Sequence, residues 1–246
     1  MTQLRLAVVS LLLLAAVGHL YFGGLKPANL KPLYNNIAEL NEVVRNLMQV
    51  EEIRNAWMRD YYTKQALERV EQLQHIGDTS GFQILYNVIV PEVQCPVMVR
   101  VGSIVDGGKF VCNPNAISEK NCRIYSLGIN DEISFDQEIQ KITGNRCRIY
   151  GYDNREQQQH TKDSYKKING KLGVIHISET KGHRIEDLFD SNNDTFVDIL
   201  KIDVEGAEMT TLVPFLSNRK YRVCQILVEM HGSAKTHLKL LVGIAK

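Results

Sequence analysis

Residues 197–208 read VDILKIDVEGAE, and together with the segment that follows them they combine three local signals in a row. The first part is mostly apolar on both alternating faces, which is typical of a strand buried inside a parallel sheet. An acidic turn with a glycine follows at residues 203–206, and residues 209–216 then have a helical pattern. The stretch therefore predicts a buried strand that runs through a polar turn into a helix.

The same pattern recurs along residues 122–246. Four further apolar segments have the character of strands, at residues 122–129, 147–152, 172–178 and 223–229. Helical segments are expected between and after the strands, at residues 134–143, 157–168, 184–189, 209–216 and 233–246. Strands that alternate with helices predict an α/β fold with a doubly wound, mainly parallel sheet.

Polar residues at the strand ends are the candidates for function, because ligands bind such sheets at the carboxyl ends of the strands. Gly128 permits a tight turn and close approach of a ligand to the backbone. Asp153 follows the second strand, where a carboxylate can accept hydrogen bonds from the ribose hydroxyls of an adenosyl cofactor. Asp203 ends the fourth strand, and Glu229 and His231 follow the fifth. The alternative for Asp153 is an ordinary solvated turn acid, and the alternative for His231 is a surface histidine.

Several of these segments resemble known methyltransferases. LKIDVEGAE, residues 200–208, is similar to the signature of FkbM-type S-adenosylmethionine-dependent methyltransferases. Four further segments, in their order along the chain, resemble the METTL-type family of secretory-pathway proteins: DGGK (106–109), IYSLGINDEISFD (124–136), YGYD (150–153) and ILVEMHG (226–232). The resemblance covers roughly residues 98–232. It implies a Rossmann-like methyltransferase fold, in agreement with the strands above.

The resemblance also implies roles for particular residues, with S-adenosyl-L-methionine as the cofactor. The cofactor-binding residues would be Gly128, Ile129, Asn130 and Asp153, the first three at the methionine part and Asp153 at the ribose. The catalytic residues would be Asp203, Glu229 and His231, which face the acceptor. These three could also hold a divalent ion, but no metal is predicted. The acceptor itself is unknown.

Two features depart from the usual methyltransferase pattern. The loop after the first strand has only Gly128 where most methyltransferases have several glycines, and bulky Ile129 follows. The chain ends at Lys246, whereas the family fold has two more strands, so we expect a C-terminally incomplete domain. An inactive relative that binds a ligand or partner is therefore the alternative to an enzyme. A nicotinamide-dependent oxidoreductase is disfavoured, since the Gly-x-Gly-x-x-Gly fingerprint is absent.

The N-terminus predicts a membrane anchor. Residues 6–22 carry no charge, and their length lies between that of a signal peptide and that of a membrane span. We favour an uncleaved signal anchor, with the remaining chain in the lumen of the endoplasmic reticulum or Golgi. If the segment is cleaved, the protein is secreted. The sequon Asn193-Asp194-Thr195 fits a lumenal glycoprotein.

A helical stem is expected between the membrane anchor and the predicted α/β domain. Apolar residues recur at three- and four-residue steps from Ile37 to Trp57, with a glycine-rich stop at residues 76–81. Either the stem forms a homodimer as a coiled coil, or it packs on the domain as one or two helices, which we favour because the heptad is not sustained. The predicted domains are residues 1–32, 33–81 and 82–246.

The net charge and the cysteine content limit the classes of partner and the cellular compartment that fit this protein. With 29 basic and 28 acidic residues the net charge is +1, which argues against a nucleic-acid partner. Five cysteines form no Cys-x-x-Cys pair and match no zinc site. Cys112 and Cys122 are close enough in sequence to close one loop in an oxidising compartment. The alternative is five free or buried thiols.

Overall fold

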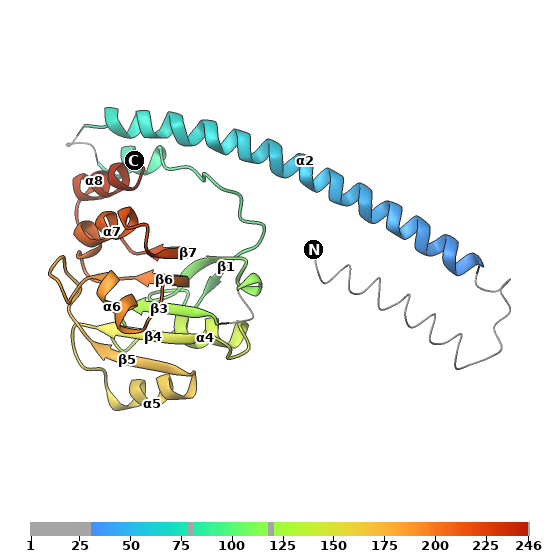
Figure 1. The fold of residues 1–246 in the computed structure, drawn as a ribbon. Helices are drawn as coiled ribbons and strands as arrows, with labels where there is room; N and C mark the ends of the chain where they lie inside the picture. The colour runs from blue at the N-terminus through green and yellow to red at the C-terminus, as the bar shows by residue number, and fades with distance from the viewer. Residues whose placement is uncertain (1–30, 78–80, 118–120, 246) are drawn as a thin grey trace. The chain divides into compact units, whose positions relative to one another are not determined.

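The structure is a computed structural model that describes residues 31–77, 81–117 and 121–245. The chain divides after Asp60 into two compact units, and the second unit contains the sheet (Figure 1). The hydrophobic segment at residues 6–22 lies outside the described residues. No helix within the described ranges is long and apolar enough to span a bilayer.

The central sheet has five strands in the order β5-β4-β3-β6-β7, and every neighbouring pair is parallel. The strands are β3 (Arg123–Leu127), β4 (Arg148–Asp153), β5 (Gly170–Val174), β6 (Phe196–Ile202) and β7 (Arg222–Val228). The helices that connect or follow them are α4 (Ser134–Ile142), α5 (Gln159–Lys167), α6 (Ile185–Ser191), α7 (Glu208–Ser217) and α8 (Ala234–Ile244). The predicted α/β fold with a doubly wound parallel sheet is confirmed.

Alternating side chains of the strands build a core on each face of the sheet. Tyr125 and Leu200 point to the face covered by α6, α7 and α8. Their sequence neighbours Ile124 and Ile199 point to the opposite face, which α4 and α5 cover. All four side chains are fully buried. Because both faces are covered, the strands must be apolar on both sides, which is the pattern seen in the sequence.

Two features differ from the sequence-based expectation. An antiparallel hairpin of β1 (Met98–Val101) and β2 (Lys109–Cys112) precedes the sheet, after the short helix α3 (Phe82–Asn87) and before a 3-10 turn at Pro114–Ala116. Strand β5 ends at Val174 instead of residue 178, because it pairs only with β4, whose last paired residue is Asp153. Residues 175–177 thereby leave the sheet and line a pocket.

The predicted stem is one continuous helix, α2 (Lys31–His75). In the part of α2 that belongs to the first unit, four apolar residues are at least 60% exposed: Leu40, Leu47, Val50 and Ile53. Near its end, Leu73 is buried with Leu85 and Leu238. The predicted domain bounds and the homodimer stay predictions.

Two disulfides join four of the five cysteines, so both alternatives left open by the sequence, a Cys112–Cys122 bond and five free thiols, are wrong. Cys112 bonds to Cys95, and Cys122 bonds to Cys147. The register of the sheet explains the second pair. Arg123 at the start of β3 is aligned with Arg148 at the start of β4, so the cysteines directly before them lie side by side. Cys224 is free and exposed.

Candidate active site

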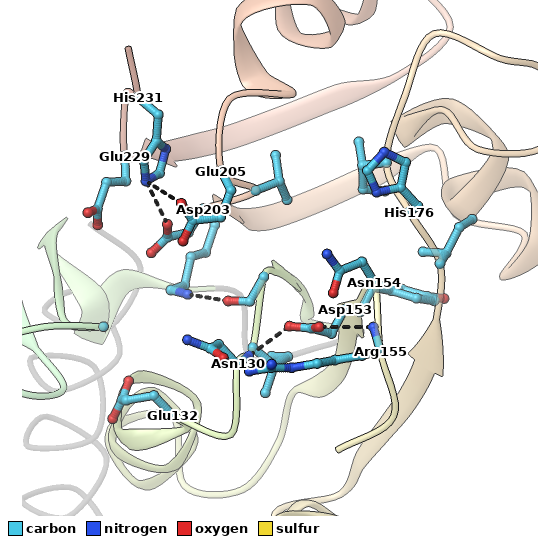
Figure 2. Close-up of a pocket in the computed structure, with 18 of the residues that line it drawn as sticks. Asn130, Glu132, Asp153, Asn154, Arg155, His176, Asp203, Glu205, Glu229 and His231 are labelled. Atoms are coloured by element: carbon cyan, nitrogen blue, oxygen red, sulfur yellow. Dashed lines mark hydrogen bonds and ion pairs between the residues drawn. The ribbon is translucent and has the colours of Figure 1, made fainter. Parts of the chain in front are cut away.

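A pocket of about 390 Å³ lies at the carboxyl ends of β3, β4, β5, β6 and β7 (Figure 2). All seven residues predicted from the sequence line it: Gly128, Ile129, Asn130, Asp153, Asp203, Glu229 and His231. The sheet order brings them together, since β3 is central between β4 and β6. Figure 2 shows Asp153 and His231 on different sides of the pocket.

The turn after β3 is held tightly against the end of β6. Gly128 has φ +81°, and a Cβ atom there would overlap the carbonyl oxygen of Asp203. The Gly128 N–H donates to the carbonyl of Tyr152 at 2.8 Å. Buried Lys201 donates from Nζ to the carbonyl of Gly128 at 3.2 Å. Glycine is thus required at this turn by both backbone conformation and space.

The Asp153 carboxylate lines the pocket and is held by two backbone N–H groups. Its side chain is 8% exposed, and its Oδ2 accepts a hydrogen bond from the Asn130 N–H at 2.7 Å. Its Oδ1 accepts from the Arg155 N–H at 3.1 Å. Arg155 also contacts the side chain of Asn130. A carboxylate oxygen has two acceptor positions, so each oxygen can still accept a ligand hydroxyl.

The opposite side of the pocket is a cluster of charges around Lys109. Its Nζ lies 3.2 Å from Asp203 Oδ2 and 2.5 Å from Glu229 Oε2. Burial tends to lower the pKa of Lys109, but Glu229 and Asp203 outweigh it, and the pKa is raised. Asp203, Glu229 and His231 each offer a ligand atom, all within 4.8 Å of one another. In this arrangement the Lys109 ammonium supplies the positive charge between the two carboxylates.

His231 is anchored by a buried glutamate. Glu208 is fully buried, and its Oε1 lies 2.7 Å from His231 Nδ1 and accepts the His231 backbone N–H at 2.9 Å. Nε2 lies 3.6 Å from Glu205 and 3.8 Å from Asp203. Burial tends to lower the pKa of His231, but Glu208, Glu205 and Asp203 outweigh it, and the pKa is raised.

Sequence reasoning missed three residues that build this site: Lys109, Lys201 and Glu208. The DGGK motif contained Lys109 but gave no sign that the β1–β2 hairpin reaches the pocket. Glu208 lies in the first turn of α7, where its favourable interaction with the helix N-terminus would by itself account for an acid. Its full burial and its contact with His231 depend on tertiary structure. The acidic turn VEGAE at residues 204–208 was the sequence signal that could have pointed to Glu208.

Asp136, a buried carboxyl on α4, gives a testable pH dependence. Burial raises the pKa of Asp136 to about 6, partly opposed by Lys201, Ser126 and Tyr165. Since the ordinary value is 3.8, the native state holds this proton more tightly than the unfolded state between about pH 4 and 6. The contribution of Asp136 to stability is therefore greatest below pH 4 and is lost as the pH rises to about 6.

We expect Asp136→Asn to remove that slope. The difference in unfolding free energy between variant and wild type should change by about 2–3 kcal/mol, in favour of the variant, from pH 4 to 7. Urea unfolding at several pH values measures it. Asp163→Asn, at an exposed position on α5, serves as the control and should give a constant difference. Parallel profiles for wild type and Asp136→Asn would show that the carboxyl titrates normally.

The comparison with protein families identifies the domain. A family model described as a methyltransferase domain matches residues 50–242. The chain belongs to the methyltransferase family. The match begins within α2, spans all five parallel strands and ends in α8, so the pocket lies inside the methyltransferase domain. No curated protein and no solved structure is significantly similar to the chain.

Methyltransferase domains generally use S-adenosylmethionine, and the residues of the pocket fit this group. Gly128 leaves the backbone open to close approach, and the Asp153 carboxylate can accept ribose hydroxyls. Ile175 and Ile177, directly after β5, give an apolar wall suited to a base. The acids at the other side suit a positively charged sulfonium group. The domain is that of a methyltransferase enzyme.

Proposed function

We propose that the protein binds S-adenosylmethionine in this pocket and transfers its methyl group to an acceptor, within the secretory pathway. The observation that carries the proposal is the single pocket that joins the Gly128 turn and Asp153 to Asp203, Glu229 and His231. The FkbM-type and METTL-type sequence motifs support it, because LKIDVEGAE supplies both Asp203 and Glu208.

The proposed position of the cofactor follows from the polarity of the lining. The adenine would lie along Ile175 and Ile177, with the ribose hydroxyls on Asp153. The methionine part would follow the turn from Gly128 to Asn130. The cofactor supplies an electrophilic methyl group on a positively charged sulfur. The chain aligns that group with the acceptor, which is the main way such an enzyme lowers the barrier.

The secretory placement is supported by three independent features. Residues 6–22 are uncharged and follow Arg5. Asn193 of the sequon lies exposed in the turn after α6, where a glycan can be attached. The two disulfides are of the kind that persists in oxidising compartments. A membrane anchor with the methyltransferase domain in the lumen accounts for all three.

Calorimetric titration of S-adenosylmethionine into the purified full chain tests the proposal, with Asp153→Ala as the variant. We expect micromolar binding by the wild type and at least a tenfold loss in the variant, because the ribose loses its carboxylate partner. Asp163→Asn should bind like the wild type. No binding by a folded wild type would refute the proposal.

Transfer of a radiolabelled methyl group to components of a cell extract then separates an enzyme from an inactive relative. Binding without transfer would favour the alternative, a ligand-binding module. The specific observation behind that alternative is the turn after β3, where only Gly128 remains and Ile129 follows it into the pocket wall.

A further inference from the structure

We propose that the acceptor atom is a hydroxyl oxygen and that His231 Nε2 takes its proton, with Glu208 as the residue that positions the imidazole. This inference rests on the proposed function, since it names the acceptor class of the same site. The geometry of four groups carries it: His231, Glu208 beneath it, and the Asp203 and Glu205 carboxylates beside it.

Glu208 determines which ring nitrogen carries the proton. Its Oε1 accepts the His231 backbone N–H, and its Oε2 accepts the Gly206 N–H at 3.0 Å. A carboxylate that accepts these donors is an acceptor at Nδ1 as well, so Nδ1 must be the protonated nitrogen of the neutral ring. Nε2 is then left with a lone pair, on the side of the ring that lines the pocket.

The chain folds specifically to make this contact. Glu205 and Gly206 both have positive φ, 54° and 108°, in the turn between β6 and α7. This turn directs the first residue of α7, Glu208, back beneath the end of β7, where His231 lies three residues beyond the strand. A non-glycine residue with positive φ, such as Glu205, is uncommon and is retained where surrounding structure holds it.

The carboxylates around the His231 imidazole favour its protonated form, and Lys109 is the one charged group that opposes it. Glu208 contacts it from α7, Asp203 and Glu205 face Nε2 from the β6–α7 turn, and Glu229 lies on its own segment. Lys109 from β2 faces Asp203 and Glu229 and balances part of their charge. An imidazolium that forms during the reaction would thus be stabilised by carboxylates on two sides.

The proposed methyl transfer forms one bond, breaks one bond and moves one proton. A lone pair of the acceptor hydroxyl oxygen forms the new O–CH₃ bond while the S–CH₃ bond breaks. The electron pair of the broken bond stays on sulfur, which becomes neutral. The hydroxyl proton passes to Nε2 of His231, and the resulting imidazolium later returns it to solvent. No oxidant, reductant or metal is required.

The lining of the acceptor side argues for a hydroxyl over other nucleophiles. A carboxylate or phosphate acceptor is already an anion and needs no base, and beside Nε2 it would be repelled by the Glu205 and Asp203 carboxylates. An ammonium group would be held in its protonated, unreactive form by the same acids. A neutral hydroxyl suffers neither effect, and it is the class that gains most from a base at the transition state.

The first test is the protonation state of His231 in the full chain, by nitrogen NMR with labelled histidine. The chain has seven histidines, and loss of one signal in His231→Gln assigns the ring. We expect the Nδ1–H tautomer and a titration above that of an ordinary histidine. In Glu208→Gln the amide oxygen can still accept Nδ1–H, so the tautomer should remain while the titration moves down by about one pH unit.

The matched control is Glu68→Gln, an exposed acid on α2. It should leave tautomer and titration unchanged. An Nε2–H tautomer in the wild type would overturn the proposal. So would a His231 titration that Glu208→Gln does not move while the variant remains folded by circular dichroism.

The second test identifies the chemical class of the product formed in a cell extract with tritiated-methyl cofactor. A methyl ether resists mild alkali and releases methyl iodide in hot hydriodic acid, and this is the expected result. Release of tritiated methanol by mild alkali would indicate an ester, and label that survives hydriodic acid would indicate an N-methyl product. Either would overturn the hydroxyl assignment.

The pH profile of the same transfer adds a signature that a merely structural role would not produce. The rate should rise as His231 loses its proton, and in Glu208→Gln this rise should move to lower pH while its plateau falls at least tenfold. Failure of the proposed function itself looks different. It would be seen as absent cofactor binding by calorimetry, whatever the state of His231.

Discussion

Gly128→Ala is expected to abolish cofactor binding and to lower the free energy of unfolding by about 3 kcal/mol or more. Two effects add at this position. The backbone has φ +81°, which an L-residue other than glycine adopts at a cost. In addition, the new Cβ would overlap the carbonyl oxygen of Asp203, which is backbone and cannot move aside like a flexible side chain.

Gly144→Ala provides the matched control for Gly128→Ala. Gly144 also has positive φ, +65°, but a Cβ there would have no atom within 4 Å. It should therefore cost only the conformational strain, about 1 kcal/mol, and leave cofactor binding intact. Chemical denaturation and calorimetry of both variants measure the comparison. Equal destabilisation by the two variants would contradict the close approach of β3 and β6 at this turn.

Removal of the Cys122–Cys147 disulfide is expected to lower the free energy of unfolding by about 3.5 kcal/mol. The bond closes a loop with a sequence separation of 25, and both cysteines are fully buried. The unfolded chain of Cys122→Ala/Cys147→Ala gains the conformational freedom that the bond removes. The disulfide also joins the starts of β3 and β4, so its removal should destabilise the pairing of strands in the central sheet.

Urea unfolding of the double variant against the wild type measures this effect. Cys224→Ala is the control, because this thiol is exposed and forms no disulfide, and it should change stability by less than about 0.5 kcal/mol. A double variant as stable as the wild type under oxidising conditions would show that the bond does not form in the folded protein.

The sequence predicted the sheet well because its strands are buried on both faces. A strand such as β6 is buried at every position after Phe196 and is mostly apolar, and such a run between helical segments has few other interpretations. The β1–β2 hairpin was missed for the opposite reason. Its burial pattern is mixed, with Met98 64% exposed and Val101 fully buried, so the short segment carries no clear periodicity.

The site could be predicted as a set of strand ends but not as a network of contacts. A parallel sheet brings the carboxyl ends of its strands to one edge, so the residues at those ends must share that edge whatever the details. Strand direction alone therefore predicts that Gly128, Asp153, Asp203 and His231 lie near one another, and all four line the same pocket. The pattern itself was sufficient, because it depends only on strand direction.

The disulfides show where sequence reasoning could have gone further. CRIY occurs at residues 122–125 and again at 147–150, at the start of two consecutive strands. If those strands are neighbours in register, their cysteines are adjacent, and the structure shows this register. The order of strands in the sheet was the missing fact, and nearness in sequence suggested the pair Cys112 and Cys122 in its place.

The α/β class, the strands and the ligand-binding edge of the sheet were predictable from the amino-acid order, because they follow from local periodicity and from strand direction. The contact of Lys109 with Asp203, the contact of Glu208 with His231 and the pairing of the cysteines became visible only in the folded chain. Those contacts join residues from different elements. Their distances depend on strand order and register, neither of which has a one-dimensional signature in the chain.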